Sequence, residues 1–103
     1  ERVIVLEDGD NTVGRDPECT VWLDASGVSR RHARIRTVRG DEAVLLQDLG
    51  SKNGTLVQNS PITGQVRLTD GAVIQIGSVE LTLRVWSEGK SPETERIPKR
   101  KPV

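Results

Sequence analysis

Apolar and polar residues alternate along most of this 103-residue chain. The clearest run covers residues 79–86, in which Val or Leu stands at every second position from Val79 to Val85. Because successive side chains of a β-strand point to opposite faces, such alternation predicts a strand with one buried face. The pattern predicts further strands at 2–6, 21–23, 32–36, 42–47, 55–58, 65–68 and 72–76.

Turn-forming residues separate these predicted strands. Gly, Asn, Asp, Ser and Pro are concentrated at 7–11, 24–27, 39–41, 53–54, 59–61, 69–71 and 77–78. Many short strands divided by turns every 8–12 residues or so are typical of antiparallel sandwiches. No window shows a sustained period of 3.6 residues, which predicts very little helix. The expected fold class is therefore all-β, a two-sheet antiparallel β-sandwich.

The alternation stops at Ser87. Residues 87–103 hold three of the five prolines, mixed charges and, before the last residue, a single large apolar residue, Ile97. Such a segment buries too little apolar surface to offset the entropy of ordering it. We therefore expect a folded domain over 1–86 and a flexible, disordered tail or linker over 87–103. At the other end the chain begins almost inside a predicted strand, as expected of an excised domain that lacks its first native strand.

Composition narrows the classes of function. The formal net charge is zero, and residues 1–86 carry ten basic and twelve acidic residues, so the body has no general attraction for polyanions and any anion site must be local. Cys19 is the only cysteine, which excludes an intrachain disulfide and favours the cytoplasm. No stretch approaches the roughly 18 apolar residues of a membrane span, and no leader pattern is present, so we expect no membrane partner.

Three turns concentrate hydrogen-bond donors near a glycine: 14–15, 29–32 and 51–55. A phosphate monoester carries about −1.5 to −2 charge at pH 7 and has three acceptor oxygens. Guanidinium, ammonium and hydroxyl groups suit such an ion, and an Asn amide can both donate to and accept from the backbone of an extended peptide. Loops gathered at one end of a rigid sandwich would bring these groups together.

The order and spacing of four motifs resemble the signature of the forkhead-associated (FHA) domain over about residues 3–86. They are Gly14-Arg15, Ser29-x-x-His32, Asp48-Leu49-Gly50-Ser51-Lys52-Asn53-Gly54-Thr55 and Leu68-x-x-Gly71-x-x-Ile74-x-Ile76-Gly77. The resemblance implies a sandwich of the SMAD/FHA type whose loops at one end bind phosphothreonine peptides. It thus implies a signalling module that mediates phosphorylation-dependent protein–protein interaction.

The resemblance also implies roles for single residues. Arg15, Ser29 and Lys52 match positions that contact the phosphate. Arg30 and Asn53 match positions that contact the phosphate or the peptide backbone beside the phosphothreonine. The turn at Gly77-Ser78-Val79 matches the place where the family often reads the third residue after the phosphothreonine. Residues expected to hold the loops in shape are Gly14, His32, Gly54 and Thr55.

The sequence is also compatible with other functions. The same scaffold would also suit a phosphate-independent interaction or assembly module. A nucleic-acid surface is a further alternative, formed by the basic tail and the arginines at 30, 31, 34, 36 and 39. Arg34 and Arg36, however, are expected to face solvent simply because Ala33 and Ile35 face inward. No aromatic residue for base stacking lies among these arginines. A phosphorylated Thr94, with Ile97 three places on, could occupy the site of a neighbouring molecule or its own.

We do not expect an enzyme. Ser29 and His32 invite a hydrolase reading, but a catalytic pair also needs a third orienting group and an oxyanion hole. A histidine that braces its loop by hydrogen bonds is the preferred interpretation of His32. No cofactor and no metal are expected.

Overall fold

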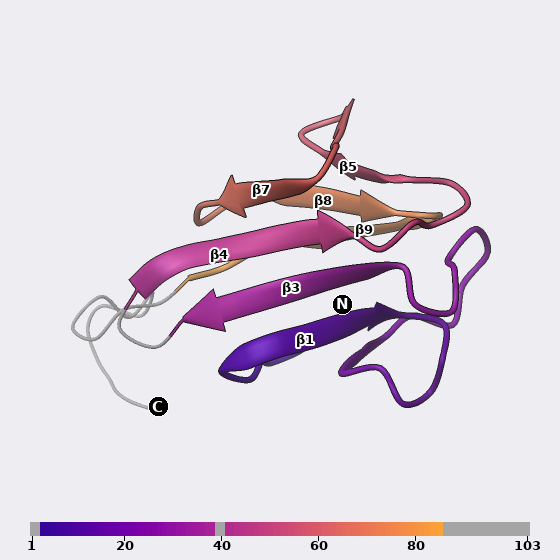
Figure 1. Ribbon diagram of the computed structural model, residues 1–103, viewed down its shortest axis with the longest axis horizontal. Helices are drawn as coiled ribbons and strands as arrows, with labels where there is room; N and C mark the ends of the chain where they lie inside the picture. The colour runs from indigo at the N-terminus through magenta and orange to yellow at the C-terminus, as the bar shows by residue number, and fades with distance from the viewer. Residues whose placement is uncertain (1–2, 39–40, 86–103) are drawn as a thin grey trace.

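The computed structural model describes residues 3–38 and 41–85, and only the backbone of residues 41 and 42. These residues form two sheets packed face to face (Figure 1). The first sheet has five strands in the order β2-β1-β3-β4-β7: β1 Gly9–Gly14, β2 Val21–Trp22, β3 Ala33–Val38, β4 Asp41–Asp48 and β7 Gln65–Leu68. The second has four strands in the order β6-β5-β8-β9: β5 Thr55–Val57, β6 Ser60–Pro61, β8 Val73–Ile76 and β9 Val79–Thr82.

The core lies between the sheets and consists of Val, Leu, Ile and Ala side chains. The inward residues of β3 are Ala33 and Ile35, and those of β8 are Ile74 and Ile76; all four are at most 3% exposed. Each alternates with a residue that faces outward, as the period of two predicted. The all-β sandwich is thereby confirmed, and the described residues contain no helix that could span a membrane. One pair departs from the antiparallel pattern, since β2 runs parallel to β1.

The N-terminal region differs from the prediction. Residues 3–6 form no strand, and β1 begins at Gly9, inside the stretch expected to be a turn. The cause is the buried Asn11 side chain, whose Oδ1 accepts from the N–H of Glu7 at 2.7 Å and whose Nδ2 donates to the Glu7 carbonyl at 3.0 Å and to the Ile35 carbonyl at 3.1 Å. A side chain thus binds the backbone groups that a strand ladder would have used.

Several strand boundaries also differ from the prediction. The expected turn at 59–61 lies one residue earlier, because Gln58 and Asn59 adopt positive φ values of 50° and 68° and Ser60–Pro61 then pairs with β5 as β6. β9 ends at Thr82, although Leu83 still donates to the Ala72 carbonyl at 2.8 Å and accepts from Gly71. Trp86, the end of the predicted strand, and the predicted tail at 87–103 with Thr94 lie outside the described residues.

One end of the sandwich, called the rim below, gathers the segments that the sequence marked for chemistry. It consists of the loops 15–20, 23–32 and 49–54 and the turn 77–78. The register Val13↔Ala33↔Asp48 places the end of β1, the start of β3 and the end of β4 side by side. The 77–78 turn joins them, since Ser78 donates its N–H to the Ser26 carbonyl at 3.1 Å. Figure 1 shows these loops at the right-hand end of the molecule.

Candidate functional site

Arg15 begins the first rim loop and is fixed by its backbone and by one side-chain nitrogen. Its N–H donates to the Ser29 carbonyl at 3.0 Å, and its carbonyl accepts from the Trp22 indole at 3.0 Å. Its Nε donates to the Val28 carbonyl at 3.1 Å. Among the described residues, no hydrogen bond or ion pair engages its two terminal nitrogens. The guanidinium is therefore held in place with its outer edge available to an anion.

Gly14, one residue earlier, lets two rim loops touch. A Cβ placed on Gly14 would lie 2.1 Å from the Arg30 carbonyl oxygen and 2.9 Å from the Ser29 carbonyl oxygen. Both atoms belong to the backbone, so no side-chain rotation could relieve the overlap. The Gly-Arg pair therefore combines a close backbone approach with the charge that follows it.

Ser29 links the second and third rim loops. Its Oγ accepts from the backbone N–H of Lys52 at 3.0 Å. The hydroxyl uses a lone pair in this bond and keeps its own proton free to donate. Lys52 is exposed, so its ammonium can turn toward the same region. The structure thus brings Arg15, Ser29 and Lys52 to one end of the molecule, as expected.

His32 is fully buried and joins the same two loops. Its Nδ1 accepts from the backbone N–H of Ser29 at 3.0 Å, so Nε2 carries the proton and donates to the Gly54 carbonyl at 2.8 Å. This arrangement requires the neutral ring. Both ring nitrogens bind backbone groups, and neither contacts the Ser29 hydroxyl as a Ser–His catalytic pair would require.

Asn53 lies at the tip of the third loop and is exposed. Its Nδ2 donates to the Gly27 carbonyl at 3.0 Å, which orients the amide and leaves Oδ1 and the second N–H for another partner. Gly27 is itself pressed against the 77–78 turn, because a Cβ on Gly77 would lie 2.6 Å from the Gly27 carbonyl carbon. Asn53 is therefore placed beside the turn that the sequence linked to specificity.

Asp48 anchors the third loop, and sequence reasoning gave it no role. Its Oδ1 accepts from the hydroxyls of Ser51 at 2.6 Å and Thr55 at 2.8 Å, and its Oδ2 accepts from the N–H groups of Gly50 at 2.9 Å and Ser51 at 3.0 Å. Burial would raise the pKa of Asp48, but these hydrogen bonds outweigh it and lower the pKa below its ordinary value. An Asp followed by Gly and Ser two and three places on is the signal that could have predicted this turn.

The expected loop-supporting residues of this region take part in the same network. Thr55 is buried and donates to Asp48, and Gly54 donates its N–H to the Ser51 hydroxyl at 2.9 Å. Gly54 has a φ of +82°, a conformation that favours glycine.

Arg30 lies at the rim but points toward an acid. Its Nη2 is 3.7 Å from Asp16 Oδ2, and the same oxygen is 4.0 Å from Arg31. Both guanidinium groups are largely exposed, so these ion pairs are weak. Of the five residues expected to bind a phosphopeptide, Arg30 is the one whose side chain already has a charged neighbour.

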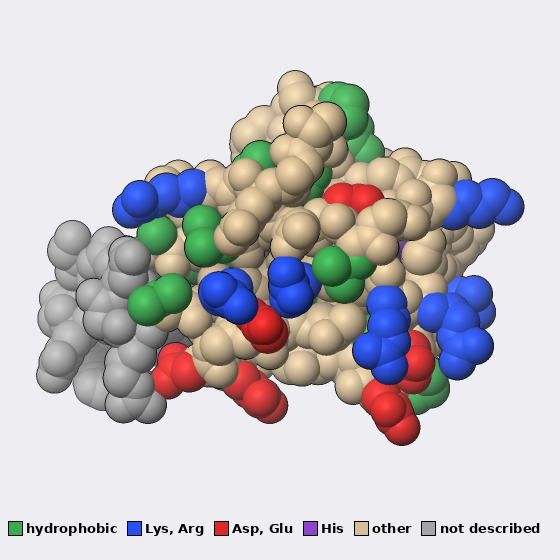
Figure 2. Space-filling model, in the orientation of Figure 1, with side chains coloured by type: hydrophobic (Ala, Val, Ile, Leu, Met, Phe, Trp, Pro, Cys, Tyr) green, Lys and Arg blue, Asp and Glu red, His purple; other side chains and the backbone are tan. Residues whose placement is uncertain are grey.

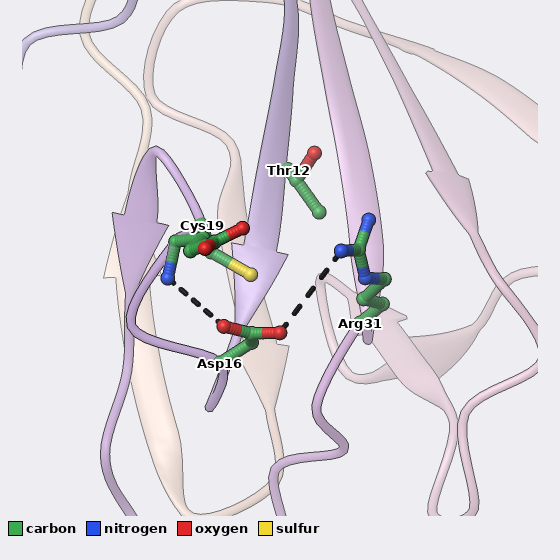
Figure 3. Close-up of a pocket in the computed structure, with 5 residues that line it drawn as sticks. Thr12, Asp16, Cys19 and Arg31 are labelled. Atoms are coloured by element: carbon green, nitrogen blue, oxygen red, sulfur yellow. Dashed lines mark hydrogen bonds and ion pairs between the residues drawn. The ribbon is translucent and has the colours of Figure 1, made fainter.

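A pocket formed by the rim loops 15–20 and 23–32 together with Thr12 of β1 does not suit a phosphate. Thr12, Asp16, Glu18, Cys19 and Arg31 line it (Figure 3), so it holds two carboxylates against one guanidinium. Burial and the adjacent Asp16 charge raise the pKa of the Cys19 thiol, which donates to the Arg30 carbonyl at 3.4 Å. A thiol in this state is a poor nucleophile. The described residues contain no group of three or more acidic, His or Cys side chains placed to hold a metal.

Known proteins match the chain over most of its length. A sequence profile of the FHA domain matches residues 11–77. The FHA domain-containing protein FhaA of Mycobacterium tuberculosis is 40% identical over 84 residues, which are 82% of this chain and 15% of that protein. The oxoglutarate dehydrogenase inhibitor of Corynebacterium efficiens is 44% identical over 77 residues, 75% of this chain and 52% of that protein.

The fold comparison agrees with these matches. A solved structure that concerns phosphothreonine-dependent FHA domain interactions superposes with a TM-score of 0.74 at 40% sequence identity and covers 80% of this chain and 82% of its own. The chain therefore spans nearly the whole of that solved domain, but only about half or less of the curated relatives' own lengths.

Proposed function

We propose that this chain, which belongs to the FHA domain family, binds phosphothreonine in a partner protein and so mediates phosphorylation-dependent protein–protein interaction. The observation that carries this proposal is the meeting of three rim loops at one end of the sandwich. The free edge of Arg15, the hydroxyl proton of Ser29 and the amide of Asn53 come from three different loops that hydrogen bonds tie together. The similar structure named above supports phosphothreonine as the ligand.

The chemistry of these groups fits a phosphate dianion and the peptide that carries it. Arg15 supplies the planar charge, Ser29 a neutral donor and Lys52 a mobile charge. Asn53 can donate to and accept from the peptide backbone on either side of the phosphothreonine. Arg30 assists from the rim, and does so more weakly because Asp16 competes for its guanidinium. Gly14, His32, Gly54 and Thr55 hold the loops that present these groups.

The remaining proposals concern the setting of the domain. We propose that it binds without catalysing a reaction, as the names of its relatives as inhibitors and regulators suggest. The cytoplasm is our prediction from the single, buried cysteine. We propose 1–86 as the bounds of the binding unit and 87–103 as a tail or linker. The identity of the phosphorylated partner depends on the parent protein.

The proposal is tested by isothermal titration calorimetry with one peptide in its phosphothreonine, phosphoserine and unphosphorylated forms. Binding of the phosphothreonine form alone is expected, whereas equal binding of all three would favour the phosphate-independent module. Charge-assisted hydrogen bonds contribute about 1.5–3 kcal/mol each. We therefore expect Arg15→Ala to lower affinity at least about tenfold, which corresponds to 1.4 kcal/mol.

A matched control for this variant is Arg84→Ala. Arg84 is also an exposed arginine, but it lies 3.9 Å from Asp70, beyond the end of β9 that is farther from the rim. It should leave affinity unchanged. Equal losses in the two variants would contradict a role for Arg15 at the phosphate.

A further inference from the structure

The outer face of the five-stranded sheet carries two rows of side chains across β1, β3, β4 and β7. The row nearer the rim follows the register Thr12↔Arg34↔Gln47↔Gln65. The next row follows the register Asp10↔Arg36↔Leu45↔Arg67. We call these eight residues the outer face. Figure 2 views the molecule from this side, with basic side chains lying over β3.

The three arginines of the outer face differ in how their charge is balanced. The charge of Arg36 is paired, because its Nε and Nη2 donate to the two carboxylate oxygens of Asp10 at 2.8 and 3.5 Å. The hydrogen bond from Arg36 lowers the pKa of Asp10, so this acid stays charged at neutral pH. Arg34 donates to the neutral amide oxygen of Gln47 at 2.5 Å. Arg67 is exposed, and its guanidinium makes no ion pair or hydrogen bond with the described residues.

The outer face therefore has more positive charge than it can balance by itself. Asp10 is the one acid among its eight residues, against three arginines. Leu45 lies half-buried between Arg36 and Arg67 in the second row and adds an apolar centre. Arginines around an apolar centre, with glutamines to donate and accept hydrogen bonds, form the kind of surface that protein partners use.

The outer face is continuous with the rim. Arg34 is the second residue of β3, which starts at the rim, and the second row lies two residues, roughly 7 Å, farther along the strands. An extended peptide rises by a similar amount, about 3.3 Å per residue. A chain leaving the rim would thus pass both rows within about six residues of a phosphothreonine bound there.

We propose that the outer face, through Arg34, Leu45 and Arg67, docks an acidic segment of the phosphorylated partner, close in sequence to the phosphothreonine. This inference rests on the proposed function and adds a second contact area to it. Charge complementarity selects the partner, because a segment with Glu or Asp would supply the anion that Arg67 lacks and a second one for Arg34, which shares Asp10 with Arg36. Nucleic acid fits less well, since residues 1–86 carry more acidic than basic residues and the outer face offers no aromatic side chain for stacking.

The test compares three phosphothreonine peptides in calorimetry: a core peptide, the core with four glutamates added on its N-terminal side, and the core with four added on its C-terminal side. Peptides with serines in place of the glutamates are the controls for length. We expect at least one glutamate extension to raise affinity about fivefold at 50 mM NaCl, the size expected of two exposed ion pairs. The gain should shrink at 300 mM NaCl, because salt screens exposed charges.

Two variants connect this gain with the outer face. Arg34→Gln with Arg67→Gln should abolish the gain and leave affinity for the core peptide within about twofold, as the lost pairs are remote from the phosphate. The matched control is Asp10→Asn with Arg36→Gln, which changes two residues of the same rows without changing net charge and should keep the gain. Thermal unfolding of both double variants is the check that each is folded.

The outcomes separate this inference from the proposed function. If the core peptide binds and no extension adds affinity, or the gain survives in the Arg34/Arg67 variant, the docking surface is refuted while phosphothreonine binding stands. If the core peptide fails to bind, the proposed function falls and this inference falls with it. Tight binding of a 20-base-pair DNA duplex that is lost in the Arg34/Arg67 variant would also overturn it, in favour of a nucleic-acid surface.

Discussion

The core and the rim of this sandwich are held by different kinds of contact. In the core, aliphatic side chains such as Leu46 and Ile76 are fully buried and pack against one another without hydrogen bonds. At the rim, polar side chains hold the loops through hydrogen bonds to backbone groups: His32 ties the second loop to the third, and Asp48 holds the third loop in shape. Core packing determines whether the chain folds, whereas the rim hydrogen bonds determine the relative positions of Arg15, Ser29 and Asn53.

Because the contacts differ, we expect the free energy of unfolding and the affinity for peptide to respond to different substitutions. Apolar contacts are not directional, so losing one lowers stability with little change in loop geometry. Hydrogen bonds at the rim are directional, and the loss of one lets a loop move. Substitutions in the core and at the rim therefore test whether stability and binding are separable.

The largest effect on stability is expected from the core variant Ile76→Ala. Removal of a fully buried Ile side chain typically costs 2–5 kcal/mol, and we expect about 3 kcal/mol from urea unfolding. Affinity of the folded protein for a phosphothreonine peptide should change less than about twofold. A large loss of affinity at a temperature where the variant is folded would show that core packing also determines the geometry of the rim loops.

Asp48→Asn should cost less stability but affect both properties. The carboxylate accepts four hydrogen bonds, and an amide would turn a donor toward at least one of the present donors. We expect a loss of about 2 kcal/mol in unfolding free energy and weaker peptide binding, since the loop of Lys52 and Asn53 loses its anchor. Unchanged affinity in calorimetry would mean that the loop keeps its shape without Asp48.

Ser29→Ala should affect binding far more than stability. The hydroxyl accepts one hydrogen bond, from Lys52 N–H, and we expect its loss to cost about 0.5–1 kcal/mol of stability. Affinity for the phosphothreonine peptide should fall about tenfold, because both the phosphate donor and the link between two loops are lost. Thr37→Ala is the matched control, since Thr37 also uses its hydroxyl in one hydrogen bond, to the Glu7 carbonyl at 2.7 Å, but lies near the end of β3 that is farther from the rim, and it should leave affinity unchanged.

The smallest expected effect is a pH dependence that Asp48 imposes. Its pKa is lowered on folding, so its charged form stabilises the folded state above the ordinary pKa of about 3.9, and this contribution is lost as pH falls through the lower folded value. Unfolding free energies measured from pH 6 to pH 3 should therefore fall less steeply in Asp48→Asn than in the unsubstituted protein. Parallel curves of unfolding free energy against pH would contradict a lowered pKa of Asp48 in the folded state.

Most of the fold followed from the sequence because one face of each strand is buried. The alternation at 79–85 and around Ile35 fixes which residues point inward, and the structure confirms it. The start of β1 could not be predicted in this way, since it depends on the Asn11 side chain binding the backbone at Glu7 and Ile35. Such contacts between a side chain and the backbone leave no periodic trace in a sequence.

The rim was predicted in part. The residue types at 15, 29 and 52–53 indicated anion chemistry, and the structure brings them to one end. Their partners are backbone groups: the carbonyls of Gly27 and Val28 and the N–H of Lys52. Because almost every residue carries such groups, no sequence pattern shows which of them will be used. Asp48 was missed because its role lies in four short hydrogen bonds within its own loop and not in contact with a ligand.

We propose that loops distant in sequence hold one phosphothreonine between them. This proposal is tested most directly by titrating the 15N-labelled protein with a phosphothreonine peptide and following the signals of Arg15 Nε–H, the Ser29 and Lys52 amides and the Asn53 side chain by NMR. We expect these signals to shift together with one dissociation constant, while those of Asp70 and Arg84 stay in place. Shifts centred on Asp70 and Arg84, with the rim signals unmoved, would contradict the claim.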